Sequence, residues 1–153
     1  MKQIKTNAMR MLERQKIPYK LWEFQADVKQ AAECLKLPPE MIFKTLVTTD
    51  TKEGYYVFCI PVNEELDLKK AAAAAGVKRI EMLKQKDLFP LTGYIHGGCS
   101  PVGMKKLFPT VLDSSAENRE SILVSAGHVG MLMELAPSDL IHMVNASTDN
   151  ITK

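Results

Sequence analysis

The sequence has few of the side chains that form disulfide frameworks or metal sites. Its 153 residues include three cysteines and three histidines. Three widely spaced cysteines, an odd number, do not fit a disulfide framework, so we expect a reduced, cytoplasmic environment. His96 and Cys99 supply two metal ligands at most, whereas a zinc site takes about three or four from the protein. We therefore expect no metal and no other cofactor.

The sequence also lacks a long hydrophobic run. Uncharged apolar stretches such as residues 71–77 (AAAAAGV) are far shorter than the ~20 residues of a membrane-spanning helix. The basic amino terminus has no apolar segment after its charges, a pattern that argues against a signal peptide. We therefore expect no membrane partner.

Neither sign of charge is in large excess. There are 20 Lys and Arg residues against 18 Asp and Glu, a formal net charge of +2. This balance excludes a histone-like polycation, and we expect no DNA partner, but it leaves room for a local basic stripe that binds RNA phosphates. With 46% hydrophobic residues, the chain is long enough for one compact domain, residues 1–153.

Hydrophobic periodicity and turn residues predict short helices and strands in an irregular order. A first helix begins after a Thr6 cap and ends near Lys16, and Asp67 caps a helix that ends at Gly76. The other expected helices are residues 28–35, 80–84 and 138–144, and the expected strands are residues 19–22, 43–47, 55–60, 93–96, 110–112, 122–124 and 131–135. Because strict β-α-β alternation is absent, we predict an α+β fold with a twisted, mixed, largely antiparallel sheet or partial barrel flanked by helices.

Lys44 is unusual because it lies inside an expected strand. Alternation places it on the same face as Leu46 and opposite Phe43 and Thr45. A lysine in a strand most often lies in solvent or blocks an edge. The functional alternative is an ammonium group in a cleft, paired with a phosphate or a carboxylate. The pattern alone leaves both interpretations open.

Two segments are rich in small residues. In residues 97–103 (GGCSPVG), the glycines allow the backbone to approach a ligand and to point N–H groups at it, or they simply make a tight loop. The segment is neither a Walker A loop nor a GxGxxG fingerprint, so nothing supports nucleotide hydrolysis or hydride transfer. Residues 125–130 (SAGHVG) indicate by themselves only a tight connection.

Two further patterns have ordinary explanations. Cys99 near His96 suggests a thiol nucleophile with a base, but no neighbour supplies an orienting third group, and free cysteines are more often small core residues. The middle of the chain is locally basic, which describes either a solvated face or a track for RNA phosphates. The cations concerned are Lys69, Lys70, Lys78, Arg79, Lys84, Lys86, Lys105 and Lys106.

Six short blocks, taken in order, resemble the YbaK-type trans-editing proteins, which are related to the editing domain of bacterial prolyl-tRNA synthetases. The blocks are residues 43–46 (FKTL), 66–72 (LDLKKAA), 92–94 (TGY), 97–106 (GGCSPVGMKK), 124–127 (VSAG) and 134–136 (ELA). The resemblance implies a single aminoacyl-tRNA editing domain that hydrolyses the ester of mischarged tRNA, most often cysteine on tRNA(Pro). Prolyl-tRNA synthetase is then a possible partner.

The resemblance also implies roles for individual residues. Lys44 matches the family lysine and is expected to hold the terminal phosphate or ribose of the tRNA, while the N–H groups of Gly97 and Gly98 polarise the ester carbonyl or place a water. The resemblance offers two nucleophiles, the substrate's own cysteinyl thiol or a water. If the thiol attacks its own ester, Cys99 is incidental to the chemistry. Expected substrate-binding residues are Phe24, Thr45, Cys99, Ser100, Pro101, Ser125, Ala126 and Gly127, and expected tRNA-binding residues are Lys69, Lys70, Lys105 and Lys106.

Three departures from the family pattern concern the amino-acid specificity. The segment between Phe24 and Phe43 is shorter than in well-known members, Phe24 replaces a tyrosine, and residues 126–129 (AGHV) replace Gly-Gly-Lys-Arg. An editor for alanine or another small residue is therefore a second hypothesis. A non-catalytic module that binds tRNA ends is a third, and a pocket protein for a small ligand is a fourth.

Overall fold

The computed structural model describes residues 4–153; residues 1–3 of the predicted domain, which open the basic amino-terminal segment, lie outside the described residues. The helices are α1 (Asn7–Arg14), α2 (Ala31–Leu35), α3 (Leu68–Ala75), α4 (Gln85–Thr92) and α5 (Pro137–Val144), with short 3-10 helices η1 (Val28–Gln30), η2 (Pro39–Met41) and η3 (Ser114–Asn118). The strands are β1 (Lys20–Glu23), β2 (Phe43–Thr49), β3 (Tyr55–Pro61), β4 (Glu81–Met82), β5 (Thr110–Asp113), β6 (Ile122–His128), β7 (Met131–Leu135) and β8 (Ser147–Asp149). Within residues 4–153, no helix has the length and apolarity needed to span a bilayer.

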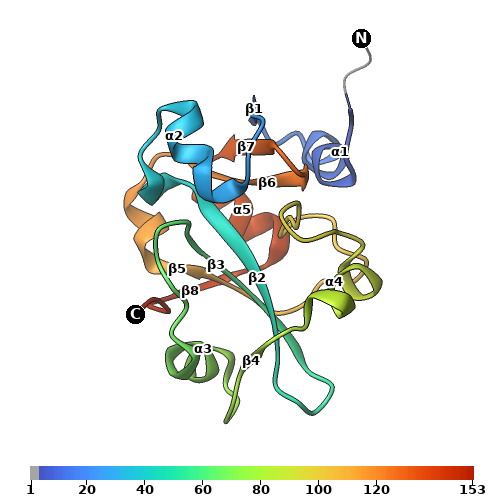
Figure 1. Ribbon diagram of the computed structural model, residues 1–153, viewed down its shortest axis with the longest axis vertical. Helices are drawn as coiled ribbons and strands as arrows, with labels where there is room; N and C mark the ends of the chain where they lie inside the picture. Colours follow the sequence, from blue (N-terminus) through green and yellow to red (C-terminus); the bar gives the residue numbers. More distant parts are fainter. Residues whose placement is uncertain (1–3) are drawn as a thin grey trace.

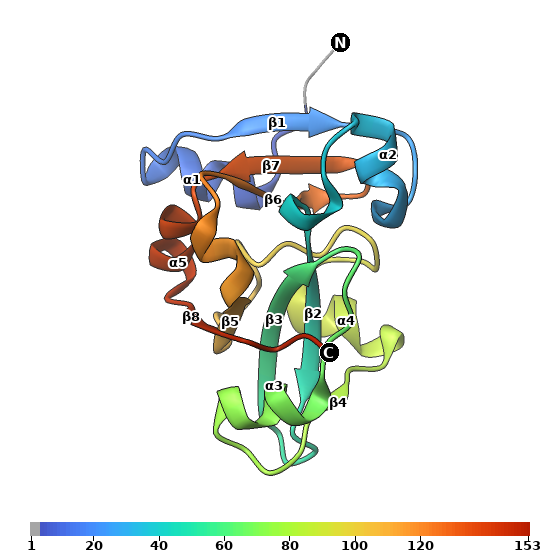
Figure 2. The same ribbon diagram turned by 90° about the vertical axis from the view of Figure 1, so that its left-hand side faces the viewer.

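The strands form two sheets. An antiparallel sheet has the order β1-β7-β6, and a mixed sheet has the order β4-β2-β3-β5-β8 with parallel pairing of β3 with β5 and of β5 with β8. In Figure 2, β1 and β7 run across the top of the molecule, while β2 and β3 run below them. Helices lie around the two sheets (Figure 1). The predicted α+β class is confirmed, with the strands divided between two sheets.

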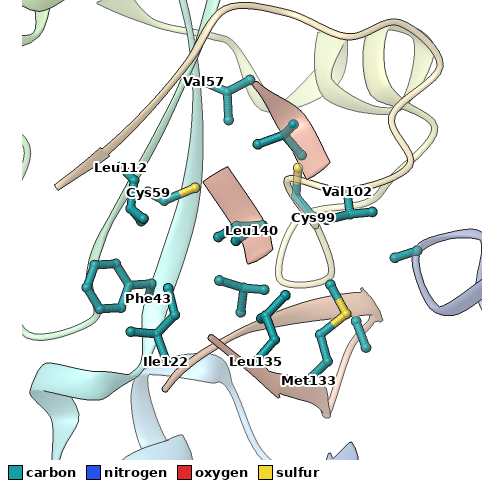
Figure 3. Packing of buried hydrophobic residues seen from close by; sticks show 14 of the residues in the cluster. Phe43, Val57, Cys59, Cys99, Val102, Leu112, Ile122, Met133, Leu135 and Leu140 are labelled. Atoms are coloured by element: carbon teal, nitrogen blue, oxygen red, sulfur yellow. The ribbon is translucent and has the colours of Figure 1, made fainter. Parts of the chain in front are cut away.

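The main hydrophobic core lies between the two sheets. Phe43 of β2, Ile122 of β6 and Leu135 of β7 are buried in it, at 0%, 0% and 3% exposure (Figure 3). The start of β2 also touches the three-stranded sheet directly, through a parallel bridge between Ile42 and Leu123. Burying side chains of this size contributes about 1.5–3 kcal/mol each, so this core holds the two sheets together.

A second core lies under α3 and is completed by the last strand segment. Asp67 caps α3 as predicted, because its carboxylate accepts from the N–H groups of Lys69 and Lys70. Ile151, which is 0% exposed, packs in this core, and its C=O accepts from the Asp67 N–H. The segment after β8 therefore fastens α3 to the mixed sheet.

Two predicted elements are wrong, and four further elements, α4, β8, η2 and η3, have no counterpart in the prediction. Residues 80–84 form no helix: Glu81–Met82 pairs with Thr48 and Thr49 of β2, so tertiary pairing overrides the local pattern. Residues 93–96 form no strand, because α4 ends at Gly93 in a left-handed conformation and a turn follows. The helix α4 contains Pro90, and β8 is only three residues long, so neither has a strong sequence signal.

Thr6 provides a test of the fold, because it joins α1 to the irregular part of β6 between Ser125 and His128. Its hydroxyl accepts from the Met9 N–H at 3.1 Å, which caps the helix, and donates to the Ala126 C=O. We expect Thr6→Ala to lower the free energy of unfolding by about 1–2 kcal/mol, as cap and tertiary hydrogen bond are lost together. Urea unfolding measures this change. Thr6→Ser keeps the hydroxyl, so a similar loss in that variant contradicts the hydrogen-bond explanation.

Candidate functional site

A cavity of about 400 Å³ opens along the edge of β2 that faces away from β3. One end of this edge meets β6 at the Ile42–Leu123 bridge, and the other end meets β4 at Thr48. Between these ends the two sheets separate, and the cavity fills the space. Its lining residues are Asp27, Val28, Lys29, Phe43, Lys44, Thr45, Leu46, Val47, Met82, Leu83, Gln85, Leu88, His96, Gly97, Cys99 and Ser125.

Lys44 lines this cavity with a half-buried side chain. Burial lowers its pKa and the nearby charge of Lys29 lowers it further, whereas the carboxylates of Glu64 and Glu65 raise it. Holding an ammonium group partly out of water costs free energy, so a lysine here is suited to bind an anion. The structure thus favours the functional interpretation of Lys44 over a purely solvated one.

Lys29 is a cavity residue that the sequence did not reveal. It lies in η1, where the Asp27 carboxylate accepts from its backbone N–H at 3.1 Å, and its charge acts on Lys44. In the sequence, Lys29 belongs to an ordinary short helix about fifteen residues before Lys44. Only the tertiary fold brings the two cations to one cavity.

The glycine-rich segment divides into a cavity wall and its support. Gly97 lines the cavity with φ +86°, a left-handed conformation that favours glycine. The Gly98 N–H donates to the Ile95 C=O at 3.0 Å, and a side chain on Gly98 would lie 3.1 Å from the Val129 nitrogen. The Gly98 N–H thus closes a turn, and the residue packs against the β6–β7 connection without lining the cavity. Its expected contact with the ester stays a prediction.

Ser100 and Pro101, two of the expected substrate-binding residues, are buried behind the cavity wall. The Ser100 hydroxyl accepts from the Val102 N–H at 3.2 Å, and the Tyr94 hydroxyl donates to the Val102 C=O at 2.6 Å. Neither Ser100 nor Pro101 lines the cavity. These residues hold the glycine-rich segment in place, and a role in substrate contact has no support from the geometry.

The small-residue segment contributes one residue to the cavity. Ser125 lines it and accepts from the Gly127 N–H at 3.1 Å. Ala126 and Gly127 lie behind it, where Gly127 packs so tightly that a side chain would approach Tyr94 to 2.9 Å. Phe24 is also outside the cavity: its N–H donates to the Gly130 C=O, and its ring packs against the core below α2.

Cys99 lines the cavity as a neutral thiol. Burial raises its pKa to about 12, and burial likewise raises the pKa of Cys59 to about 12. At neutral pH such thiols are protonated and poorly nucleophilic. Among residues 4–153, no three His, Cys, Asp or Glu side chains are grouped as a metal site.

The four lysines expected to bind tRNA lie outside this cavity. Lys105 and Lys106 line a second cavity beside Pro90 and Leu91 of α4, and the Lys105 ammonium lies 5.5 Å from the centre of the Phe89 ring. Lys69 and Lys70 are on α3, and the Lys70 ammonium donates to the Thr152 C=O at 2.7 Å. The structure therefore does not gather these four cations at one site.

The state of the buried thiols can be tested by chemical labelling. At pH 8 a thiol with a pKa near 12 is ionised in about one molecule in 10⁴, so we expect iodoacetamide to modify the exposed Cys34 and spare Cys59 and Cys99. Mass spectrometry of the native protein measures this, and labelling in urea, where all three react, is the control. Native labelling of Cys99 as fast as Cys34 contradicts the assignment of a protonated thiol.

Comparison with known proteins gives consistent results. A model of the aminoacyl-tRNA editing domain family matches residues 23–143. EbsC of Enterococcus faecalis, named as a candidate Cys-tRNA(Pro)/Cys-tRNA(Cys) deacylase, is 51% identical over 155 residues, which cover 98% of this chain and 94% of EbsC. A proline–tRNA ligase of Shouchella clausii is 30% identical over 103 residues, which cover 67% of this chain and 18% of the ligase.

The same relationship is visible in three dimensions. A crystal structure described as a candidate trans-editing enzyme for prolyl-tRNA synthetase superposes with a TM-score of 0.86 at 25% identity, covering 99% of each chain. The predicted resemblance is confirmed, and the chain belongs to the aminoacyl-tRNA editing domain family.

Proposed function

We propose that this protein is a trans-editing deacylase that hydrolyses the ester between cysteine and tRNA(Pro). The observation that carries the proposal is the cavity along β2, with a half-buried lysine and a glycine-rich wall, in a chain 51% identical to EbsC. The likeness to part of a proline–tRNA ligase supports tRNA(Pro) as the tRNA.

The need for such an enzyme follows from the limits of side-chain recognition. A pocket that accepts proline cannot strongly reject a smaller side chain, because one methylene group is worth only about 1–3 kcal/mol. Cysteine and alanine therefore enter, and a second site must remove them from the tRNA. A cavity of about 400 Å³ has room for a small aminoacyl group and part of the terminal ribose.

Lys44 and Lys29 are proposed to bind a phosphate or ribose oxygen of the tRNA end. The charge of Lys29 lowers the pKa of Lys44, and both residues line the cavity. Two like charges held near one another, one of them half-buried, are unfavourable until an anion arrives. Binding the negatively charged tRNA end relieves this repulsion, which makes the pair a site for phosphate.

The Gly97 N–H is proposed to polarise the ester carbonyl from the opposite wall. An aminoacyl ester is already labile, so positioning and electrostatic stabilisation are sufficient for its hydrolysis. In the cysteinyl substrate, the thiol sulfur bonds to the ester carbon and the tRNA 3′ oxygen leaves with a proton. Water then opens the resulting thiolactone, and the enzyme needs no nucleophile of its own.

The cellular context is part of the same proposal. Residues 1–153 act as a single editing domain in the cytoplasm, on mischarged tRNA. Lys105 and Lys106, which line the second cavity, are proposed to contact more distant phosphates of the acceptor stem. Prolyl-tRNA synthetase is the proposed partner that supplies tRNA identity, since so small a domain offers little surface for reading a whole tRNA.

Lys44 tests the catalytic proposal. We expect wild-type protein to release cysteine from Cys-tRNA(Pro) and Lys44→Ala to lower kcat/KM by about 10- to 100-fold, the value of one charge-assisted hydrogen bond. Loss of labelled cysteine from the tRNA measures the rate. Thermal unfolding is the control, and we expect the variant to remain folded because the ammonium group is unfavourable in its half-buried place.

The same assay separates the competing hypotheses. If alanine is released from Ala-tRNA(Pro) faster than cysteine from Cys-tRNA(Pro), the protein is still a deacylase, but the amino acid that it removes is alanine. Salt-sensitive tRNA binding without release of either amino acid identifies a tRNA-end-binding module and contradicts the proposed deacylase.

Lys29 gives an independent prediction about binding. We expect Lys29→Ala to raise KM for Cys-tRNA(Pro) about 5- to 20-fold, with a smaller change in kcat. The slope of log affinity against log salt concentration is expected to fall by the value of about one phosphate contact. Steady-state kinetics at several salt concentrations measure both effects. Lys69→Ala is the matched control, since it removes an equal charge on α3, outside the cavity. Equal effects of the two substitutions contradict a local phosphate contact by Lys29.

A further inference from the structure

The backbone of β2 presents an open hydrogen-bonding edge to the cavity. Val47 is opposite Val57 in the β2–β3 pair, and the Val57 N–H donates away from β2, to the Pro109 C=O at 2.9 Å. On β2 itself, the Val47 C=O accepts at 3.1 Å from the N–H of Leu83, the residue that follows β4. The backbone groups of Val47 therefore point away from β3.

Thr45 has the same orientation, because paired residues of an antiparallel ladder alternate between the two edges of a strand. It lies two positions before Val47 and opposite Cys59. Its N–H and C=O both point away from β3, toward the cavity that Thr45 lines. Within the described residues, β4 pairs with β2 only at Thr48 and Thr49, and the bridge to β6 is at Ile42, so no strand occupies the edge beside Thr45.

An aminoacyl ester has the groups that match this edge. Its α-ammonium group donates hydrogen bonds and its carbonyl oxygen accepts them. The two groups are attached to neighbouring carbons, as the nitrogen and the carbonyl are in one residue of a strand. In a hydrogen-bonded antiparallel pair, two residues exchange both N–H···O bonds at a Cα–Cα distance of about 5.5 Å. The aminoacyl group thus has the donor and the acceptor of a strand residue.

We propose that the aminoacyl group binds to Thr45 as a single residue of an added antiparallel strand. The α-ammonium group donates to the Thr45 C=O, and the Thr45 N–H donates to the ester carbonyl oxygen. This inference rests on the proposed function and specifies how the substrate is held. It makes the Thr45 N–H a donor to the reacting carbonyl, beside the proposed Gly97 N–H, and it selects esters that carry an α-amine.

The structure explains why the backbone is suited to this role. β2 is fixed on its other edge by a seven-residue ladder to β3, so the Thr45 N–H is held in place before the substrate arrives. The Thr45 hydroxyl lies 3.9 Å from the Cys59 Sγ. Recognition through the backbone does not depend on the amino-acid side chain, so the other cavity walls are left to read the size of that side chain.

A direct test follows the backbone amides of the wild-type protein by NMR. The probe is adenosine that carries cysteine on a 3′-amide, a stable analogue of the charged tRNA end. We expect the Thr45 amide proton to shift downfield on binding, while the Leu46 amide, which faces β3 in the ladder, changes little. The same probe without its α-amine is the control and is expected to bind about 10- to 100-fold more weakly. No shift at Thr45, or equal binding of the two probes, overturns the inference.

Kinetics separate a failure of this inference from a failure of the proposed function. Cys-tRNA(Pro) is compared with 3-mercaptopropionyl-tRNA(Pro), which keeps the thiol and lacks the α-amine, and each rate is divided by that of uncatalysed hydrolysis. We expect normalised kcat/KM to be about 10- to 100-fold lower for the second substrate. Equal normalised kcat/KM values for the two substrates contradict the pairing to Thr45 but leave the proposed deacylase activity intact. Absence of cleavage of both substrates contradicts the deacylase, and the Thr45 amide shift then decides the binding mode by itself.

Discussion

The separation of the two sheets at β2 is the constraint on which the site depends. The strand starts against β6 through the Ile42–Leu123 bridge and ends in a different sheet, beside β4. A continuous sheet would fill this region with paired strands. Because β6 and β4 meet β2 only near its ends, the middle of its edge remains open, and the cavity is built from segments far apart in the sequence. The cavity thus follows from the topology and needs no special loop.

Lysines in and outside the cavity have different surroundings. Lys44 is partly removed from water without an ion pair among the described residues, and burial lowers its pKa. A fold that only needed stability would place an apolar side chain there. Lys70, by contrast, has its ammonium group bound to the Thr152 carbonyl and helps to fasten α3. Two lysines of similar appearance in the sequence therefore have different physical roles.

The sequence predicted local structure better than the arrangement of the site. Thr6 and Asp67 are helix caps whose effect depends on residues two or three positions away, and both were predicted. Residues 80–84 were misassigned because β4 forms only by pairing with β2. Lys44, Thr45, Gly97, Cys99 and Ser125 were named from blocks of sequence and do meet in the cavity. Lys29 was missed because its proximity to Lys44 exists only in the tertiary fold.

The attachment of the segment after β8 has a consequence for the order in which contacts form. Ile151 closes the core under α3, and its carbonyl accepts from Asp67, a residue more than eighty positions earlier in the chain. Closing a loop of this length costs conformational entropy before the contact repays it, so such contacts form late. The Asp67 cap of α3 is local by comparison. The docking of the helix on its core, rather than the formation of the helix, therefore depends on Ile151.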